Sequence, residues 1–359
     1  MVVPTYRSQQ WLFDVAAGRF DVDLAISGME ARSVQDLLPN MDPRCGYDID
    51  RGAGPLRAAV ASRYGVAAEQ VLITHGAQEA LYLLYAAILN AGDEVVVRSP
   101  GWQQTTDLPA RFGATARTVA IAIADGDRDG VSRTVQALSP ATRMVVLNSP
   151  HNPTGLAWDA PQWASIAAAV DGRDVLVVND EEYLTDESRS TLHIVPNSCT
   201  VTSLSKVYGF PGLRLGWVVG PAAVVEACVN YRRYTTISNS PLLESLGLAV
   251  LDRQGQYLAD YHARLAAGWA LFSEWLADHP QLEAIPPDGT PFALCRVLLP
   301  GQPSYELCLR LLAAERLLVM PGDVFGAPGY LRISYARPEP VLRDGLRRLS
   351  RVLRAAVAG

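Results

Sequence analysis

Short apolar runs alternate with stretches rich in alanine and leucine from about residue 55 to about residue 250. Several of these runs, such as MVVL and VLVV, are continuously apolar, which is typical of strands that helices cover on both faces. Seven such strands joined by helical crossovers predict an α/β fold with a mostly parallel sheet. The expected strands span residues 71–74, 94–98, 116–121, 143–148, 175–179, 200–204 and 213–219.

The length of the chain predicts two packed units, because 359 residues exceed what one hydrophobic core usually organises. A long helix is expected over about 250–280. We therefore expect a large domain over 46–250 and a small α+β domain over 251–359. The N-terminal segment 1–45 is expected to form part of the small domain and to make dimer contacts. The expected elements of the small domain are strands at 292–297, 318–320 and 330–335 and an amphipathic helix at 340–356.

Composition and charge exclude several classes of function. A net charge of −6 argues against broad binding of polyanions, and no basic run interleaved with aromatic residues indicates a nucleic-acid partner. No stretch approaches the ~20 apolar residues of a membrane span, and the first residues lack the pattern of a signal peptide. The five cysteines include no CxxC pair, so we expect reduced thiols, no metal site and a cytoplasmic protein.

Lys206 is the one lysine among 31 basic residues. Genomic base composition commonly favours arginine, but arginine cannot form an imine because its guanidinium stays protonated. Lys206 follows an expected strand, and its neighbours Ser203, Ser205 and Arg214 are residue types that hold a phosphate dianion. A lysine at this position either pairs with a phosphate or forms an imine with an aldehyde, unless it is a surface residue beside a Gly-Pro turn.

Three further motifs follow expected strands, at the ends where parallel sheets bind ligands, and they weigh against a surface role for the lysine. N-S-P-H-N-P-T-G at 148–155 is by itself either a plain turn or part of a site. V-N-D-E-E-Y at 178–183 places Asp180 at the end of a buried strand, where a carboxylate needs a cation such as a protonated pyridine nitrogen. T-H-G-A-Q-E-A-L at 74–81 opens a helix whose first N–H groups favour a phosphate.

Together these motifs resemble the fold-type I pyridoxal-phosphate enzymes, specifically the class I/II aminotransferases similar to aspartate aminotransferase. The resemblance covers almost the whole chain. It implies that Lys206 carries pyridoxal 5′-phosphate as a Schiff base and moves the α-proton of the substrate. It also implies that Asp180 keeps the ring nitrogen protonated and that Tyr183 and Asn152 bind the phenolic oxygen. The other cofactor residues that it implies are Ala77, Gln78, Trp102, Ser203, Ser205, Arg214 and, reaching the neighbouring subunit of a homodimer, Tyr47.

The same resemblance implies how the substrate binds. Arg332, in G-Y-L-R-I-S-Y, matches the arginine that clamps the α-carboxylate with two parallel hydrogen bonds, and Asn152 and Gly28 are expected beside it. Ala77 departs from the family pattern because it replaces a hydroxyl residue, so one phosphate contact is expected from the backbone alone. His75 and His151 flank the site and are expected to be structural rather than catalytic.

The resemblance implies transamination of an α-amino acid through an external aldimine and a quinonoid, completed by a keto acid in a ping-pong cycle. A rival function stays open, because the segment 231–244 also resembles capreomycidine synthase, which eliminates a β-hydroxyl from a hydroxyarginine and cyclises it. For such a substrate Glu30 either pairs with a guanidinium or is a solvated loop residue. Retention of Tyr183 favours transamination. A third reading, an inactive relative that acts as a scaffold, conflicts with the intact lysine and its partners.

Overall fold

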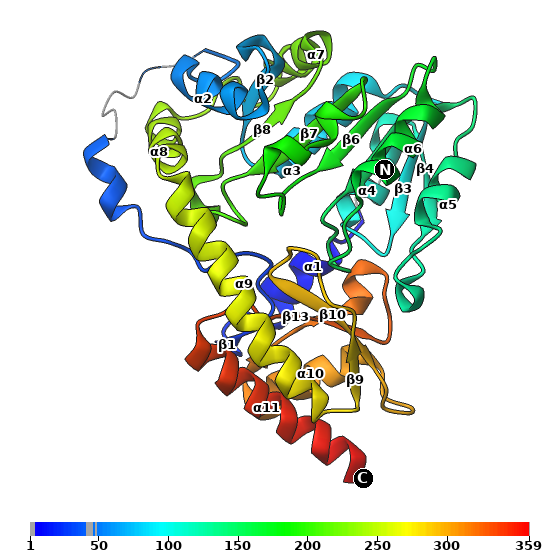
Figure 1. The fold of residues 1–359 in the computed structure, drawn as a ribbon, viewed down its shortest axis with the longest axis vertical. Helices are drawn as coiled ribbons and strands as arrows, with labels where there is room; N and C mark the ends of the chain where they lie inside the picture. Colours follow the sequence, from blue (N-terminus) through cyan, green and yellow to red (C-terminus); the bar gives the residue numbers. More distant parts are fainter. Residues whose placement is uncertain (1–3, 41–45, 47–48, 359) are drawn as a thin grey trace.

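The computed structural model describes residues 4–40, 46 and 49–358, and its largest element is a seven-stranded sheet (Figure 1). The strand order is β2-β8-β7-β6-β5-β3-β4, and neighbouring strands run parallel except that β8 is antiparallel to both β2 and β7. The predicted α/β fold with a mostly parallel sheet is therefore confirmed. Its strands are β2 Val71–Thr74, β3 Glu94–Ser99, β4 Thr115–Ala120, β5 Thr142–Asn148, β6 Leu176–Asp180, β7 Ser198–Ser203 and β8 Gly216–Val219.

Helices cover both faces of this sheet (Figure 1). They include α2 Gly54–Tyr64, α3 Ala77–Ile88, α4 Gln103–Asp107, α5 Gly130–Gln136, α6 Ala160–Val170, α7 Ala222–Arg232 and α8 Pro241–Asp252. On β3, Val95 and Val97 pack in one core with α3 and α7, whereas Val96 points the other way and packs with α6. The strand is continuously apolar because successive side chains enter two different cores.

The strand predicted at 213–219 begins later than expected, at Gly216. Pro211–Leu213 instead form a short 3-10 turn, and Arg214 has a left-handed backbone with a φ of 49°. Gly216 pairs with Ser203 across the β7–β8 ladder. The turn therefore places Arg214 beside the end of β7, where the lysine motif begins.

The long helix predicted around residues 250–280 is confirmed as α9, and a separate helix, α8, ends just before it. The chain forms two helices, α8, which ends at Asp252, and α9, which spans Gln254–Ala277. Arg253 separates them with a non-helical φ of −107°. Helix α9 then runs from the seven-stranded sheet to the C-terminal part of the molecule (Figure 1).

The C-terminal part contains a four-stranded antiparallel sheet of order β12-β13-β10-β9. Two short strands, β1 Val22–Asp23 and β11 Leu317–Leu318, pair in parallel beside it and join the N-terminal segment to this part. The boundaries expected near residues 45 and 250 stay a prediction. The remaining α-helices and strands are α1 Arg7–Gln10, β9 Leu282–Ala284, β10 Phe292–Val297, α10 Ser304–Glu315, β12 Met320–Pro321, β13 Tyr330–Ser334 and α11 Glu339–Ala358.

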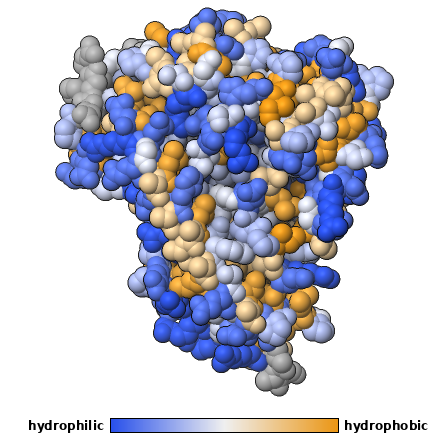
Figure 2. All heavy atoms as spheres, viewed as in Figure 1, coloured by the Kyte–Doolittle hydropathy of each residue, from blue (hydrophilic) through white to orange (hydrophobic). Residues whose placement is uncertain are grey.

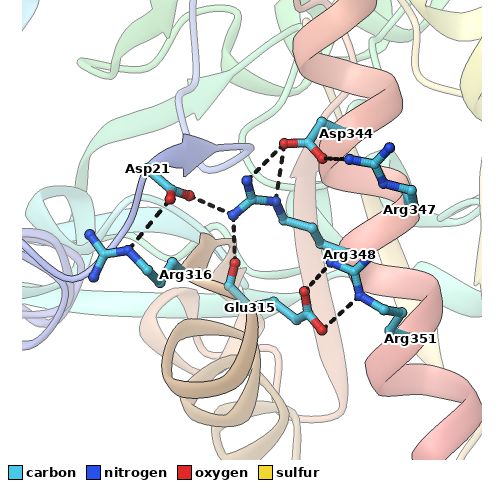
Figure 3. Close-up of polar contacts among 7 residues, drawn as sticks. All are labelled: Asp21, Glu315, Arg316, Asp344, Arg347, Arg348 and Arg351. Atoms are coloured by element: carbon cyan, nitrogen blue, oxygen red, sulfur yellow. Dashed lines mark hydrogen bonds and ion pairs between the residues drawn. The ribbon is translucent and has the colours of Figure 1, made fainter.

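Charged side chains reinforce the attachment of the N-terminal segment. Arg348 of α11 lies between Asp21, which precedes β1, and Asp344 of its own helix, and it also donates to the carbonyl oxygen of Glu315 (Figure 3). Hydrophilic residues gather over this lower end of the molecule, where α11 lies (Figure 2). Within the part of the chain that the structure describes, no helix is both long enough and apolar enough to cross a bilayer.

Candidate active site

A cavity of about 130 Å³ lies at the carboxyl ends of β5, β6 and β7. Ligands of parallel sheets bind at these ends because the loops that follow the strands diverge there. Tyr47 lies outside the described residues, so its expected contact with a neighbouring subunit stays a prediction. The other ten residues expected to hold the cofactor all line the cavity, namely Ala77, Gln78, Trp102, Asn152, Asp180, Tyr183, Ser203, Ser205, Lys206 and Arg214.

Lys206 lies three residues after the end of β7, and its Nζ donates to Oγ of Ser27 at 3.2 Å. Burial lowers the pKa of the lysine, and the carboxylate of Glu182 is the strongest opposing influence. Gly28 packs directly against the lysine, because a methyl group added to it would lie 2.9 Å from Cα of Lys206. The amide of Met29 also donates to the carbonyl oxygen of Lys206 at 2.9 Å. The N-terminal segment therefore fixes the lysine from outside the sheet, and a contact between Gly28 and the substrate stays a prediction.

Asp180 ends β6, is half-buried and lines the same cavity. Burial, followed by the nearby charge of Glu182, raises the pKa of Asp180 to about 8, although Lys206 opposes this shift. Its Oδ1 accepts a hydrogen bond from the backbone of Glu182 at 3.1 Å. A buried carboxylate with a raised pKa gains most from a cationic partner, as the sequence predicted for this position.

An anion cradle lies at the other side of the lysine. Helix α3 begins at Ala77, directly after Gly76, whose φ is 79°. The φ of Gly76 favours glycine, and a methyl group on it would lie 2.8 Å from Nη2 of Arg214, so the guanidinium packs closely against this helix start. Ser203 and Ser205 complete the cradle with hydroxyl groups. Helix N–H groups, hydroxyls and a guanidinium are the donors that phosphate prefers.

Trp102 forms one wall of the cavity, and two contacts set its position. Its Nε1 donates to Oε1 of Gln78 at 3.1 Å, so the side chain of Gln78 holds the indole. The ring of Tyr6, from the N-terminal segment, lies 5.6 Å away between centroids. No local pattern indicated Tyr6, because its contact depends on where the N-terminal segment packs in the folded chain.

Arg332 of β13 is buried in the C-terminal sheet and does not itself line the cavity, but it contacts the cavity residue Asn152. Its Nη1 donates to Oδ1 of Asn152 at 2.7 Å, and its Nη2 donates to the carbonyl oxygen of Ala25 at 2.8 Å. The guanidinium also lies between the rings of Phe292 and Phe325, at 4.8 and 4.7 Å. Burial lowers the pKa of Arg332 to about 10, so the side chain stays charged at neutral pH.

Tyr183 is buried at the wall between the two sheets. Its ring meets Phe292 edge to face at 5.3 Å, and burial raises the pKa of its hydroxyl. The phenol therefore remains protonated at neutral pH and is a hydrogen-bond donor. Asn152 is held in place because its backbone N–H donates to Oδ1 of Asn148 at 2.6 Å.

The histidines that flank the site have protein partners. Nδ1 of His75 lies 3.0 Å from Oε2 of Glu79, and Nδ1 of His151 lies 2.8 Å from Oγ1 of Thr154. Burial, with the nearby charge of an arginine, lowers the pKa of His151 to about 3, so this ring is neutral. Glu30 lies 3.5 Å from Nη1 of Arg337, which makes an internal ion pair its observed interaction.

Among the cavity residues that the sequence did not predict, Glu182 is the one that can ionise. Glu182 lines the cavity together with Asp180 and Lys206. The available signal was its spacing, because a residue two positions after Asp180 lies on the same side of an extended chain. The motif V-N-D-E-E-Y contains two glutamates, and spacing alone would have selected the second.

Known proteins match this chain over most of its length. The family model for aminotransferase class I and II matches residues 40–349. Capreomycidine synthase of Streptomyces vinaceus is 34% identical over 314 residues, which are 83% of this chain and 78% of the relative. An arginine–pyruvate transaminase of Pseudomonas aeruginosa is 30% identical over 319 residues, which are 85% of this chain and 81% of the relative.

A solved structure is similar over the full chain. A PLP-dependent aminotransferase from Streptococcus suis superposes with a TM-score of 0.91 and 26% identity, and the match covers 99% of each chain. The family match, the shared fold and a cavity lined by a lysine, a carboxylate and an anion cradle all agree. The chain therefore belongs to the aminotransferase class I and II family, and its cofactor is pyridoxal 5′-phosphate.

Proposed function

We propose that this enzyme transfers the amino group of an α-amino acid to a keto acid, with Lys206 as the residue that binds the cofactor and moves the proton. The observation that carries the proposal is the placement of two arginines around one buried lysine. Arg214 belongs to the anion cradle at α3, while Arg332 comes from the opposite sheet. One cation serves the phosphate of the cofactor and the other serves the carboxylate of an amino acid.

The residues of the cavity fit pyridoxal phosphate in their chemistry. The missing side chain at Gly76 leaves room for Arg214 at the start of α3, where a phosphate gains N–H groups and a guanidinium together. Asp180 would hold the protonated ring nitrogen, and Asn152 and Tyr183 would bind the phenolic oxygen. Trp102 would cover one face of the ring. When bound, the cofactor delocalises the electron pair that is left at the α-carbon of the substrate.

Lys206 is suited to hold and release a proton. Burial lowers the pKa of its amine, so a larger neutral fraction is present near neutral pH than for a solvated lysine. Its hydrogen bond to Ser27 keeps Nζ directed into the cavity rather than toward solvent. The neutral amine would remove the proton from the α-carbon of the substrate and would deliver it to the aldehyde-derived carbon of the cofactor.

Arg332 would orient the substrate before the proton moves. Its hydrogen bonds to Asn152 and Ala25 fix the plane of the guanidinium. A planar guanidinium binds a carboxylate through two parallel N–H bonds, which fixes direction as well as position. The α-hydrogen is thereby presented to Lys206 and not to bulk water.

A second candidate function is elimination and cyclisation of a hydroxylated arginine. It is favoured by the 34% identity to capreomycidine synthase over 83% of the chain. The same site residues would act up to removal of the α-proton, and the reactions would differ only afterwards. The buried, protonated Tyr183 and the match to an arginine–pyruvate transaminase favour transfer.

A substrate panel separates the two reactions. The purified enzyme, loaded with cofactor, is incubated with arginine and other amino acids in the presence of pyruvate or 2-oxoglutarate, and separately with hydroxyarginines and no keto acid. We expect alanine or glutamate, detected by mass spectrometry. Loss of water from a hydroxyarginine without amino transfer would instead support cyclisation. An enzyme that forms neither kind of product over the panel contradicts both functions.

A homodimer is part of the same proposal. Tyr234 and Ile237 are large apolar side chains, and they are 91% and 49% exposed. The pair of Arg233 with Asp50 places this segment next to the chain that leads to Tyr47. Exposed apolar side chains in one area favour an interface. Sedimentation of the loaded enzyme should give twice the mass of one chain, and Tyr234→Asp should shift it toward a single chain.

A further inference from the structure

The proposed chemistry leaves one ionisable residue of the cavity without a task. Glu182 lines the cavity, although its side chain is more than nine-tenths buried and its Oε2 has no hydrogen-bond partner. The adjacent Glu181 points elsewhere, since its Oε1 accepts hydrogen bonds from Asn179, Ser190 and Thr191. Two neighbouring glutamates therefore have different surroundings, and only Glu182 faces the cofactor site.

The groups around Glu182 come from three segments. Asp180 and Tyr183 flank it on its own segment at the end of β6, Ser203 and Lys206 come from the end of β7, and Arg214 follows the 3-10 turn. Burial raises the pKa of Glu182, while Lys206, a hydrogen bond from Ser203 and Arg214 all favour its charged form. Lys206 and Arg214 are therefore the cations that favour a charged Glu182, against the effect of its burial.

The same partners are those that the cofactor would use. Ser203 and Arg214 belong to the proposed phosphate cradle, so a phosphate would compete with Glu182 for both of them. A phosphate carries about −1.5 to −2 charges at neutral pH. Glu182 would then lie close to two anionic groups, the phosphate and Asp180. Carboxylates and phosphates that share a buried site cannot all stay ionised.

We propose that Glu182 is charged when the cavity is empty and neutral when a phosphate-bearing cofactor occupies it, so that cofactor binding takes up a proton at this residue. The proton comes from solvent and forms an O–H bond on the carboxylate, and no other bond changes. The inference rests on the proposed cradle of Ser203, Ser205 and Arg214. It assigns Glu182 a task in holding the cofactor that differs from that of Asp180, which would be ionised when it pairs with the protonated ring.

Pyridoxine 5′-phosphate is the probe that isolates this step, because it has the ring and the phosphate but no aldehyde to react with Lys206. The full-length protein, freed of cofactor, is titrated with it by calorimetry in buffers of different ionisation enthalpy. The number of protons taken up is compared between the natural protein and Glu182→Gln, which resembles the neutral acid. Glu30→Gln is the matched control, because Glu30 lies outside the cavity and pairs with Arg337.

We expect the natural protein and Glu30→Gln to take up about one proton more than Glu182→Gln. As the pH rises, the affinity of these two proteins for the probe should fall more steeply than the affinity of Glu182→Gln. The extra fall should reach up to about tenfold per pH unit, because one proton is coupled to binding. Equal proton uptake in all three proteins overturns the inference. Failure of the natural protein to bind the probe at all contradicts the proposed cradle instead, so the two failures are distinguishable.

A second measurement does not depend on a variant. Infrared difference spectra of the natural protein, with and without the probe, should show a new carbonyl band of a protonated carboxyl group when the probe binds. If Glu182→Gln does not fold, the appearance or absence of this band decides the question. A loss of carboxylate bands without any new acid band would show that Glu182 moves but keeps its charge, which also overturns the inference.

Discussion

Nη1 of Arg332 donates a 2.7 Å hydrogen bond to Oδ1 of Asn152, although 180 positions separate the two residues in the chain. Arg332 belongs to the antiparallel sheet, and Asn152 lies in the loop after β5 of the seven-stranded sheet. The bond to the carbonyl oxygen of Ala25 adds the N-terminal segment. Three remote segments thus orient one guanidinium before any ligand binds, which lowers the entropic cost of placing a substrate.

Replacement of this arginine tests its assignment to the substrate. Arg332→Lys removes the fork that binds a carboxylate at two points and leaves Asn152 without its donor, so kcat/KM should fall roughly 100-fold to 1000-fold. Steady-state kinetics with the best amino donor measure this change. Arg296→Lys, on an exposed part of β10, is the control and should leave kcat/KM unchanged. A small effect at position 332 would contradict the assignment.

Lys206→Ala should abolish both turnover and the visible absorbance of the bound cofactor, because no other amine side chain exists in the chain. Borohydride treatment of the natural enzyme, followed by peptide mass mapping, should place the cofactor on one peptide. The labelled peptide identifies the residue directly, since this chain has one lysine and its only other amine is the N-terminal one. Substantial activity in the variant would overturn the role of the lysine.

Asp180 should make the stability of the empty protein depend on pH. Its pKa is raised from 3.8 to about 8, mainly by burial. A raised pKa stabilises the folded state below the unfolded value, and this contribution is lost as the pH rises through the folded value. The cofactor-free natural protein should therefore lose stability relative to Asp180→Asn between about pH 4 and pH 8, by more than about 1 kcal/mol.

Urea denaturation of both proteins at a series of pH values measures the difference. The bound cofactor should reverse the sign of this stability difference, because a protonated ring nitrogen would pair with the aspartate and not with the asparagine. The variant is thus expected to be the more stable protein when empty and the less active one when loaded. Parallel pH profiles for the two empty proteins would argue that Asp180 already has a cationic partner.

Gly28→Ala should disturb the lysine without changing any charge. The added methyl group would lie 2.9 Å from Cα and 3.1 Å from the carbonyl oxygen of Lys206, and backbone atoms cannot move away cheaply. Overpacking of this kind costs about 1–3 kcal/mol. We expect a lower Tm and weaker cofactor binding. Gly255→Ala, with nothing within 4 Å of the added methyl group, is the control and should be neutral or slightly stabilising.

Arg348 should matter more for stability than the other arginines on α11. Its side chain is 20% exposed and joins Asp21, Asp344 and the carbonyl oxygen of Glu315 (Figure 3). Ion pairs in such a network contribute more than isolated exposed pairs, so Arg348→Ala should cost about 1 kcal/mol. Arg343→Ala, in an exposed pair within the helix, should change stability by less than about 0.5 kcal/mol. Equal losses in denaturant titrations would contradict a network at Arg348.

The sequence alone determined the class of fold and most of the cofactor site. Continuous apolar runs indicated strands that are buried on both faces, and in the structure these residues form β3, β5 and β6. The residues after them, such as Asp180 and Lys206, could be assigned to one site because parallel strands end at one edge of a sheet. These inferences use only local pattern and topology, which are encoded within short stretches of the chain.

The tertiary structure decided what those residues contact. Periodicity shows that a face is buried, but not what covers it, so the packing of Gly28 against Lys206 and the bond between Arg332 and Asn152 could not be derived. Glu182 shows the reason most clearly. Its neighbour Glu181 has the same chemistry, and only the packing of remote segments decides which carboxylate enters the cavity.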